Sequence, residues 1–285
     1  MALSGTRLKD EHFKKEEFRF MDYQLKGRRA LVTGSSSGLG EAIAKMLAAE
    51  GVEVFIHGRD EKRATRVADE IRASGGLANI VLGDLSTDSG AEKVAKECLK
   101  PGNVDILVNN AGAYAHTGWM DTTPEEWKAT YNLNVVSYIR MIQHLLPSMK
   151  KSGWGRIINM GGGLAVQPLA IQPHYSATLA ARHNLSASLA RELAGTGVTS
   201  NVIAPGAILN EQVKQWLVSQ SPKHNWGVEF DEIEQNAVKQ LVPNDRQRFG
   251  RPEEIAAAVL YLVGPYSDYV SGATVRVDGG TVKSV

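Results

Sequence analysis

The sequence has few of the features that mark exported, metal-binding or membrane proteins. Cys98 is the single cysteine among 285 residues, which excludes an internal disulfide and any metal site built from several thiolates. The longest uncharged apolar stretch, 255–264, is far shorter than the roughly 20 residues of a membrane-spanning helix. Residues 1–20 mix charged side chains with three phenylalanines and lack the apolar run of a secretory signal. We therefore expect a cytoplasmic protein with no membrane segment and no bound metal.

An excess of charge of either sign is also absent. Lys and Arg total 32 and Asp and Glu total 31, so the formal net charge is +1. This balance does not indicate a surface for a polyanion, and we expect no nucleic-acid partner. The chain does contain 28 glycines and 43% hydrophobic residues, a composition typical of a globular chain of enzyme size.

From Arg28 onward, short apolar runs alternate with longer segments of helical periodicity. This alternation is typical of βαβ units, in which helices cover both faces of a parallel sheet. The regular spacing predicts a single doubly wound α/β domain of the Rossmann type with a seven-stranded parallel sheet. The expected strands are 29–33, 52–57, 78–82, 104–109, 156–160, 199–204 and 274–277, and the expected helices are 39–49, 61–74, 91–99, 125–150 and 174–194.

Two segments fall outside this rhythm. Residues 1–26 form an N-terminal extension, either a partner arm or a tail, ahead of a domain that spans 27–285. Residues from about 210 to 249 follow the sixth expected strand, and an insertion of this size is more often a functional lid than a structureless loop. Its aromatic side chains either contact an apolar part of a ligand or form the lid's own core; they are Trp216, Trp226 and Phe230.

A glycine-rich segment, TGSSSGLG at 33–40, directly follows the first expected strand and begins the first expected helix. In this setting glycines let the backbone approach a pyrophosphate, and free N–H groups at the helix N-terminus bind its charge. The spacing differs from the common G-x-G-x-x-G, and taken alone it also fits an ordinary glycine-rich turn. The candidate cofactor-binding residues here are Gly34, Ser36, Ser37, Gly38, Leu39 and Gly40.

Further candidates stand at the ends of other expected strands. The carboxyl ends of parallel strands meet at one edge of a doubly wound sheet, and such sheets bind ligands at that edge. We therefore predict that these residues line the same dinucleotide site, with the carboxylate of Asp84 accepting from an adenine amino group. They are Asp84 and Leu85 after the third strand, Asn110 and Gly112 in the NNAG turn after the fourth, and Pro205 and Gly206 after the sixth.

Together these motifs resemble the short-chain dehydrogenase/reductase family. The resemblance covers about 25–280 and rests on TGSSSGLG, GDL, NNAG, Asn134, Tyr175, Asn201 with Pro205-Gly206, and the terminal stretch from Arg248 to Gly280. It implies a Rossmann-type fold and a nicotinamide dinucleotide. It also implies a homo-oligomer, dimer or tetramer, in which the two long helices pair across subunits.

The end of the second expected strand indicates which dinucleotide is bound. Members that prefer NAD place an acidic residue there for the ribose hydroxyls, whereas this chain has Gly58 followed by Arg59. A guanidinium fits the 2′-phosphate of NADP because its planar fork donates two hydrogen bonds. Arg59 also fits an ordinary exposed residue ahead of Asp60, which is placed to cap the next helix. The charge pattern favours NADP(H) over NAD(H).

The resemblance further implies a catalytic set of Asn, Ser, Tyr and Lys, of which this chain keeps only part. Tyr175 matches the tyrosine that transfers the proton, and Asn134 matches the asparagine, so these two are the candidate catalytic residues. Leu179 stands where the family's lysine binds the nicotinamide ribose and lowers the pKa of the tyrosine. Gly162 stands where the family's serine holds the substrate oxygen.

These two departures affect the two directions of the reaction differently. Without a neighbouring cation, only about one phenol in a thousand is ionised at neutral pH. Alcohol oxidation, which needs the phenolate, should therefore suffer more than carbonyl reduction, which needs the neutral acid. A backbone nest at Gly161–Gly163 would replace the serine, although the glycines equally suit close packing. Nearby polar side chains that also fit ordinary loop positions are His116, Gln167, Gln172 and His174.

Two functions remain compatible with the sequence. The first is an NADP(H)-dependent oxidoreductase that reduces a carbonyl of a small organic substrate with an atypical catalytic set. The second is a pseudoenzyme that binds the dinucleotide and serves as a sensor or an assembly subunit. The cofactor motifs fit both, and the retained Tyr175 and Asn134 favour the reductase.

Overall fold

The short apolar runs of the sequence form a parallel sheet in the computed structural model, which describes residues 22–283. Seven strands pair in the order β3-β2-β1-β4-β5-β6-β7, and every pair is parallel. The predicted seven-stranded doubly wound fold is thereby confirmed. The strands are β1 (Arg29–Val32), β2 (Glu53–Gly58), β3 (Leu77–Leu82), β4 (Ile106–Asn109), β5 (Gly155–Met160), β6 (Val198–Pro205) and β7 (Thr274–Val277).

Burial on both faces explains why these runs form a parallel sheet. Every residue of β4 and β5 is buried, so these central strands show no alternation between apolar and polar residues. Val108 of β4 lies opposite both Val32 of β1 and Ile158 of β5. The carboxyl ends of the central strands therefore lie level, and the loops that follow them share one edge of the sheet.

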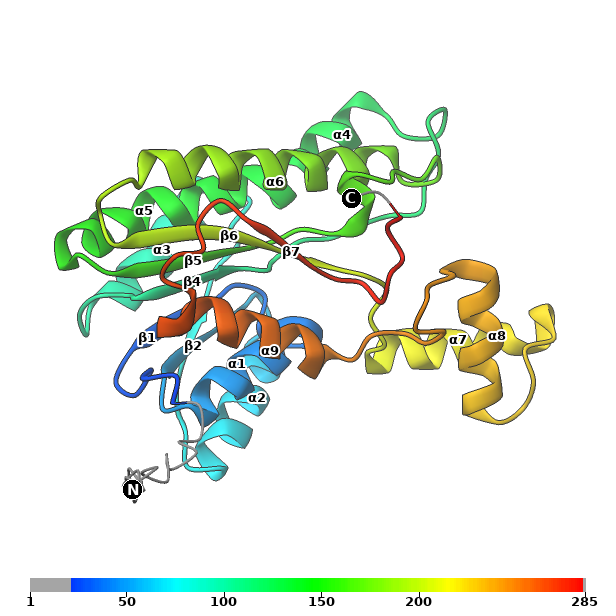
Figure 1. The fold of residues 1–285 in the computed structure, drawn as a ribbon, viewed down its shortest axis with the longest axis horizontal. Helices are drawn as coiled ribbons and strands as arrows, with labels where there is room; N and C mark the ends of the chain where they lie inside the picture. Colours follow the sequence, from blue (N-terminus) through cyan, green and yellow to red (C-terminus); the bar gives the residue numbers. More distant parts are fainter. Residues whose placement is uncertain (1–21, 284–285) are drawn as a thin grey trace, which may run out of the picture.

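Helices cover both faces of the sheet (Figure 1). On one face, α1, α2 and α9 contribute Ile43, Val67 and Val259 to a common core, and on the other, α3 and α5 contribute Val94 and Met141 to a second core. The helices are α1 (Gly38–Ala49), α2 (Glu61–Ala73), α3 (Asp88–Leu99), α5 (Ser137–Ser152), α6 (Pro173–Glu192) and α9 (Pro252–Val263). Within residues 22–283, none of the helices has the length and apolar character that a membrane crossing requires.

The helix predicted at 125–150 is interrupted in the structure. α4 (Pro124–Tyr131) begins with a capping box and has proline at its first position. A π-helical turn, Asn132–Val136, follows it and leads directly into α5. The prediction of one regular helix is wrong here, because sequence periodicity does not register the single extra residue of a π turn. Such turns are frequent at functional sites, and Asn134 lies in the middle of this one.

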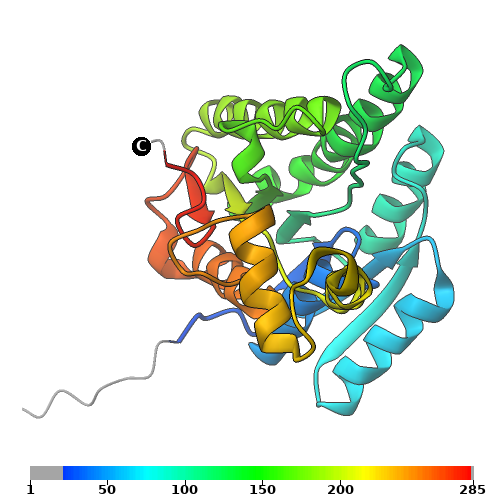
Figure 2. The same cartoon turned by 90° about the vertical axis from the view of Figure 1, so that its right-hand side faces the viewer.

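The predicted lid contains two helices that project from the carboxyl edge of the sheet (Figures 1 and 2). Trp226 is fully buried in a small core between them, and its indole Nε1 donates to Oε1 of Gln240 at 2.7 Å. Trp216 remains 49% exposed. Trp226 therefore belongs to the lid's own core, whereas Trp216 lies at the lid surface. The two helices are α7 (Glu211–His224) and α8 (Phe230–Leu241).

Most of the predicted N-terminal extension, residues 1–21, lies outside the described part of the chain. Of the remaining residues, Leu25 is buried in the core that α1 and α9 share. The ring of Tyr23 packs edge-on against Tyr266, with 6.4 Å between the ring centroids. The last residues of this segment therefore pack against the domain that follows.

Candidate active site

The glycine-rich segment joins β1 to α1 at the carboxyl edge of the sheet. Gly34 has a φ of +69°, a conformation that residues with a side chain rarely adopt. A Cβ on Gly40 would lie 2.6 Å from the carbonyl oxygen of Gly34 and 2.6 Å from Nδ2 of Asn110. Glycine at position 40 therefore lets α1 begin directly against the turn that follows β4.

The N-cap residue of α1 does not cap the helix with its side chain. Ser37 is the N-cap residue, and its hydroxyl makes no capping hydrogen bond. The first N–H groups of an α-helix have no partner within the helix, so they need a side chain, water or a ligand. Here they are available to an anion such as a pyrophosphate.

His57, at the end of β2, holds this loop in place. The N–H of Gly34 donates to Nδ1 of His57 at 3.0 Å, so the proton of the ring is on Nε2, which lies 3.2 Å from the carbonyl oxygen of Gly83. Burial lowers the pKa of His57 to about 4, which keeps the ring neutral near physiological pH. Sequence reasoning missed this residue, although a histidine at the end of an otherwise apolar strand was a signal for it.

Gly58 and Arg59, at the end of β2, lie in different surroundings: position 58 has no space for a side chain, whereas the side chain of Arg59 is exposed. A Cβ on Gly58 would lie 2.6 Å from Oγ of Ser36. Arg59 is exposed, and within residues 22–283 its guanidinium has no hydrogen-bonded or ion-paired partner. Asp60 accepts a hydrogen bond from the N–H of Arg63 and so caps α2 as expected. Arg59 is therefore an unpaired cation beside the glycine-rich loop.

The remaining strand-end candidates lie along the same edge. Oδ1 of Asp84 accepts from the N–H of Ser86 at 3.0 Å and from its hydroxyl at 2.8 Å, and these bonds hold the pKa of Asp84 below its usual value. Leu85 is buried, so its side chain belongs to the core. Nδ2 of Asn110 donates to the carbonyl oxygen of Thr33 at 2.9 Å, which ties the NNAG turn to the glycine-rich loop.

The two strand-end candidates at the end of β6, Pro205 and Gly206, join the last two strands. The N–H of Gly206 donates to the carbonyl oxygen of Val277 at 3.1 Å, and Pro205 pairs with Val277 in the sheet. A Cβ on Gly206 would lie 2.9 Å from Cα of Asp278. Glycine at this position therefore keeps the backbone of the β6 end against the turn that follows β7.

Tyr175 lies in the first turn of α6, which follows β5. Its ring packs against Tyr114, with 5.5 Å between the centroids, and its hydroxyl has no hydrogen-bond partner in the described part of the chain. Burial raises the pKa of Tyr175, so its phenol is neutral. Two further candidates, Gln172 and His116, contact each other, with 3.3 Å between Nε2 of Gln172 and Nδ1 of His116.

The side chain of Asn134 is fully engaged with the protein. Its Oδ1 accepts from the N–H of Ala113 at 2.9 Å, and its Nδ2 donates to the carbonyl oxygen of Ala113 at 2.8 Å and to Oγ1 of Thr178 at 3.3 Å. Asn134 is also completely buried. It therefore fixes the loop that carries Tyr114.

The two departures from the family pattern contact each other. Leu179 is only 1% exposed, and a Cβ on Gly162 would lie 3.0 Å from its Cδ1. A serine at 162 would thus meet the leucine that occupies the lysine position. Glycine at 162 therefore leaves the space that the side chain of Leu179 occupies.

The suggested backbone nest is mostly occupied by internal contacts. The N–H of Gly161 donates to the carbonyl oxygen of Ile203 at 2.7 Å, and the N–H of Gly162 points to Nε2 of His183 at a long 3.4 Å. His174 is buried, with its ring 6.0 Å from that of Trp127, so it lies in the packing between α6 and α4.

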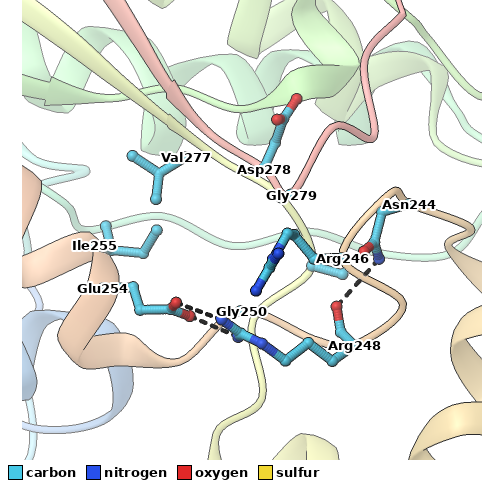
Figure 3. Close-up of a pocket in the computed structure, with 11 residues that line it drawn as sticks. Asn244, Arg246, Arg248, Gly250, Glu254, Ile255, Val277, Asp278 and Gly279 are labelled. Carbon is cyan, nitrogen blue, oxygen red and sulfur yellow. Dashed lines mark hydrogen bonds and ion pairs between the residues drawn. The ribbon is translucent and has the colours of Figure 1, made fainter.

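A small pocket lies beside this site, where β6 and β7 end (Figure 3). Arg248 donates to both carboxylate oxygens of Glu254, at 2.8 and 2.6 Å, and this pairing lowers the pKa of Glu254 to about 2. Arg251 pairs in the same way with Glu234 of α8, at 2.7 and 2.8 Å. None of the residues around Tyr175 lines the pocket, and the paired charges anchor the lid to the start of α9.

Comparison with known proteins agrees with this arrangement. A model of the short chain dehydrogenase family matches residues 28–221. The chain is 39% identical to the uncharacterized oxidoreductase YvaG of Bacillus subtilis over 267 residues, which cover 93% of this chain and 100% of that protein.

Solved structures of reductases have the same fold. L-sorbose reductase from Gluconobacter frateurii, complexed with NADPH and L-sorbose, matches with a TM-score of 0.87 and 32% identity over 93% of this chain and 100% of that one. A 3-oxoacyl (acyl-carrier-protein) reductase from Agrobacterium tumefaciens C58 with NADP bound matches with a TM-score of 0.82 and 35% identity, covering 91% of this chain and 96% of that one. The chain therefore belongs to the short-chain dehydrogenase/reductase family of oxidoreductases.

Proposed function

We propose that the protein is an NADP(H)-dependent reductase of a carbonyl group in a small organic substrate, with Tyr175 as the proton donor. The observation that carries this proposal is the unpartnered hydroxyl of Tyr175 at the same sheet edge as the glycine-rich loop. Because burial keeps the phenol neutral, it holds the proton that a carbonyl oxygen needs.

The residues of this edge fit NADP(H). The uncapped N-terminus of α1 and the close approach at Gly40 suit a pyrophosphate, and the unpaired guanidinium of Arg59 suits a 2′-phosphate. In the described part of the chain the donors of Ser86 reach only Oδ1 of Asp84, so its Oδ2 can accept from an adenine amino group. The NNAG turn and the Pro205-Gly206 backbone would line the remainder of the dinucleotide, which supplies the hydride when bound. Relatives that carry NADPH or NADP support this choice.

In the proposed reaction, Tyr175 gives its phenolic proton to the substrate oxygen as the carbonyl becomes an alcohol, and water then returns a proton to the phenolate. Gly162 brings no second donor to that oxygen, and the loss of one such donor typically costs about 10² to 10³ in rate. We therefore expect a slow reductase. Asn134 acts through Ala113, because it holds the loop from which Tyr114 packs on the ring of Tyr175.

Three further assignments go with this function. The lid, 210–249, would close over the substrate with Trp216 at its surface. We also propose a cytoplasmic homo-oligomer, dimer or tetramer. An apolar groove between α5 and α6 supports this assembly, and among the residues that line it are Ile139, Ile142, Leu146, Leu185 and Leu189.

The contact between Gly162 and Leu179 also favours a second function, a pseudoenzyme that binds the dinucleotide without turning it over. The test measures NADPH binding and NADPH oxidation against a broad panel of ketones and aldehydes on one sample. The reductase predicts turnover that disappears in Tyr175→Phe while binding persists. Binding without turnover of any carbonyl would support the pseudoenzyme, and absence of binding would contradict both functions.

A further inference from the structure

A buried cation lies beside the site. Arg182 of α6 is only 3% exposed, and within residues 22–283 no carboxylate pairs with its guanidinium. A charge that leaves water without an opposite charge is costly, so arginine is almost never fully buried unless it is paired. No residue pattern around position 182 predicts a buried cation, because arginines on helices are usually exposed.

Carbonyl groups and an aromatic ring hold this guanidinium. Nε donates to the carbonyl oxygen of Asn134 in the π turn at 2.6 Å, and Nη1 donates to the carbonyl oxygen of Met160 at the end of β5 at 3.1 Å. The guanidinium carbon lies 4.4 Å from the centroid of the Tyr138 ring. These contacts fix the position of the charge without neutralising it.

The third nitrogen of the guanidinium is free. Nη2 of Arg182 is buried and has no hydrogen-bond partner among residues 22–283. A Cβ on Gly112 would lie 2.8 Å from this nitrogen, so Nη2 faces the NNAG turn. Arg182 thus connects three segments that frame the site, namely the π turn, the end of β5 and the turn after β4.

Arg182 also affects Tyr175, which lies seven residues earlier on the same helix and therefore on the same helical face. Burial raises the pKa of Tyr175, and the positive charge of Arg182 opposes that rise. Tyr114, on the loop that packs on Tyr175, acts in the opposite direction to Arg182.

The other titratable groups nearby are tyrosines and histidines, which carry no permanent charge. Burial raises the pKa of Tyr138 on α5 to about 12. Burial and the charge of Arg182 lower the pKa of His183, the next residue of α6. The ring of His116 packs edge-on against Tyr114, with 5.6 Å between the ring centroids. Arg182 is therefore the permanent charge among the described groups that surround Tyr175.

We propose that Arg182 is a positioning residue of this site that supplies, from α6, the positive charge absent at Leu179. Its guanidinium holds the carbonyls of Asn134 and Met160 and stabilises the phenolate that Tyr175 becomes after it gives its proton to the substrate oxygen. This role deepens the proposed reductase function and rests on it. The proton balance is that of the reductase: one proton leaves the phenol for the substrate, and one returns from water.

The test follows the ionisation of Tyr175 directly, by the ultraviolet absorbance of its phenolate, without substrate or turnover. Each protein is titrated from about pH 7 towards pH 12, as far as circular dichroism shows it folded, and the titration of the same protein with Tyr175→Phe is subtracted. Arg182→Gln removes the charge and keeps N–H donors for the carbonyls. Arg182→Met is a second neutral variant that retains packing on Tyr138. Arg191→Gln, at an exposed arginine of the same helix, is the matched control.

We expect both neutral variants to raise the titration midpoint of Tyr175 by about one pH unit or more, the size of effect that a nearby opposite charge produces. Arg182→Lys, which keeps the charge but is too short to bridge both carbonyls, should stay within about half a unit of the unmodified protein, as should Arg191→Gln. In turnover, the neutral variants should lower kcat at least tenfold with little change in KM.

An unchanged Tyr175 midpoint in a folded neutral variant would overturn the proposal. A shift of about one pH unit in Arg182→Lys would also overturn it, because the effect would then depend on the shape of arginine and not on its charge. The measurement on Arg182→Lys remains decisive even if neither neutral variant folds. If the midpoints shift as expected and no carbonyl is reduced, the reductase function fails while the effect of Arg182 on Tyr175 stands.

Discussion

Substitution at Gly162 tests whether this residue and Leu179 are a packed pair. A Cβ at position 162 would lie 3.0 Å from Cδ1 of Leu179, whereas ordinary contacts begin near 3.4 Å, so the leucine methyl group must move by about 0.4 Å. Leu179 of α6 is buried, and its side chain faces position 162 after the end of β5. Overpacking of this kind costs about 1 to 3 kcal/mol, and we expect that loss of unfolding free energy in Gly162→Ala.

Leu179→Ala removes the group that the new Cβ would meet. Alone it should cost about 2 to 5 kcal/mol, because it leaves a cavity in the core. In Gly162→Ala with Leu179→Ala, the clash is absent and the new methyl group fills part of the cavity. The double variant should therefore lose about 1 to 3 kcal/mol less than the sum of the single variants.

The assay is thermal unfolding of the four proteins, in which each kcal/mol moves Tm by roughly 2 to 4 °C. Gly118→Ala is the matched control, since a Cβ there meets nothing nearer than Oδ2 of Asp121 at 3.5 Å. Its combination with Leu179→Ala should be additive. If Gly162→Ala and Leu179→Ala also add to within about 0.5 kcal/mol, the two residues do not constrain each other and the reasoning is refuted.

Three further predictions concern the cofactor loop and the acid. Arg59→Ala should weaken NADPH binding by about 1.5 to 3 kcal/mol and leave NADH binding unchanged, as measured by titration calorimetry; an equal loss for both would place Arg59 away from the 2′-phosphate. His57 is neutral when folded, so the stability that it contributes is complete above pH 6.5 and is lost as pH falls towards 4. Urea unfolding at pH 7 and pH 5 should differ by about 2 kcal/mol from this group, and His57→Asn, which keeps an acceptor but cannot titrate, should not show that difference. Because the pKa of Tyr175 is raised, alcohol oxidation should increase steadily towards alkaline pH while reduction persists at neutral pH, and Tyr175→Phe should abolish both; a flat pH profile for oxidation would remove the phenol from the mechanism.

The elements that sequence predicted well are those whose burial leaves a simple pattern. Strand β4 begins with the buried apolar run 106–108, and β5 has the buried pair Ile157 and Ile158 at its centre, so the ends of both strands were predicted to within two residues. The helices α7 and α8 were not predicted, because their apolar residues face a small local core and most of their surface is charged or polar.

The candidate site was predictable only where a motif fixes the backbone. The glycine-rich segment and the NNAG turn can be identified from their residue types, because their backbone requires glycine at positions such as Gly40, where a side chain would not fit. The sequence marks Gly162 and Leu179 each as a departure from the family pattern, but it does not show that the two positions pack against each other. The burial of Arg182 depends on carbonyls that a π turn and a strand end present, and no local pattern encodes it.

The contact between Ser36 and Gly58 has a consequence for redesign of the cofactor preference. An acidic residue introduced at 58 alone would drive its Cβ into the serine hydroxyl, so the loop would have to shift before the carboxylate could reach a ribose. Glycine at 36 would remove both of the serine atoms that the new Cβ meets. We therefore expect libraries that vary positions 36 and 58 together to yield acidic variants with NAD use that single substitutions at 58 do not yield.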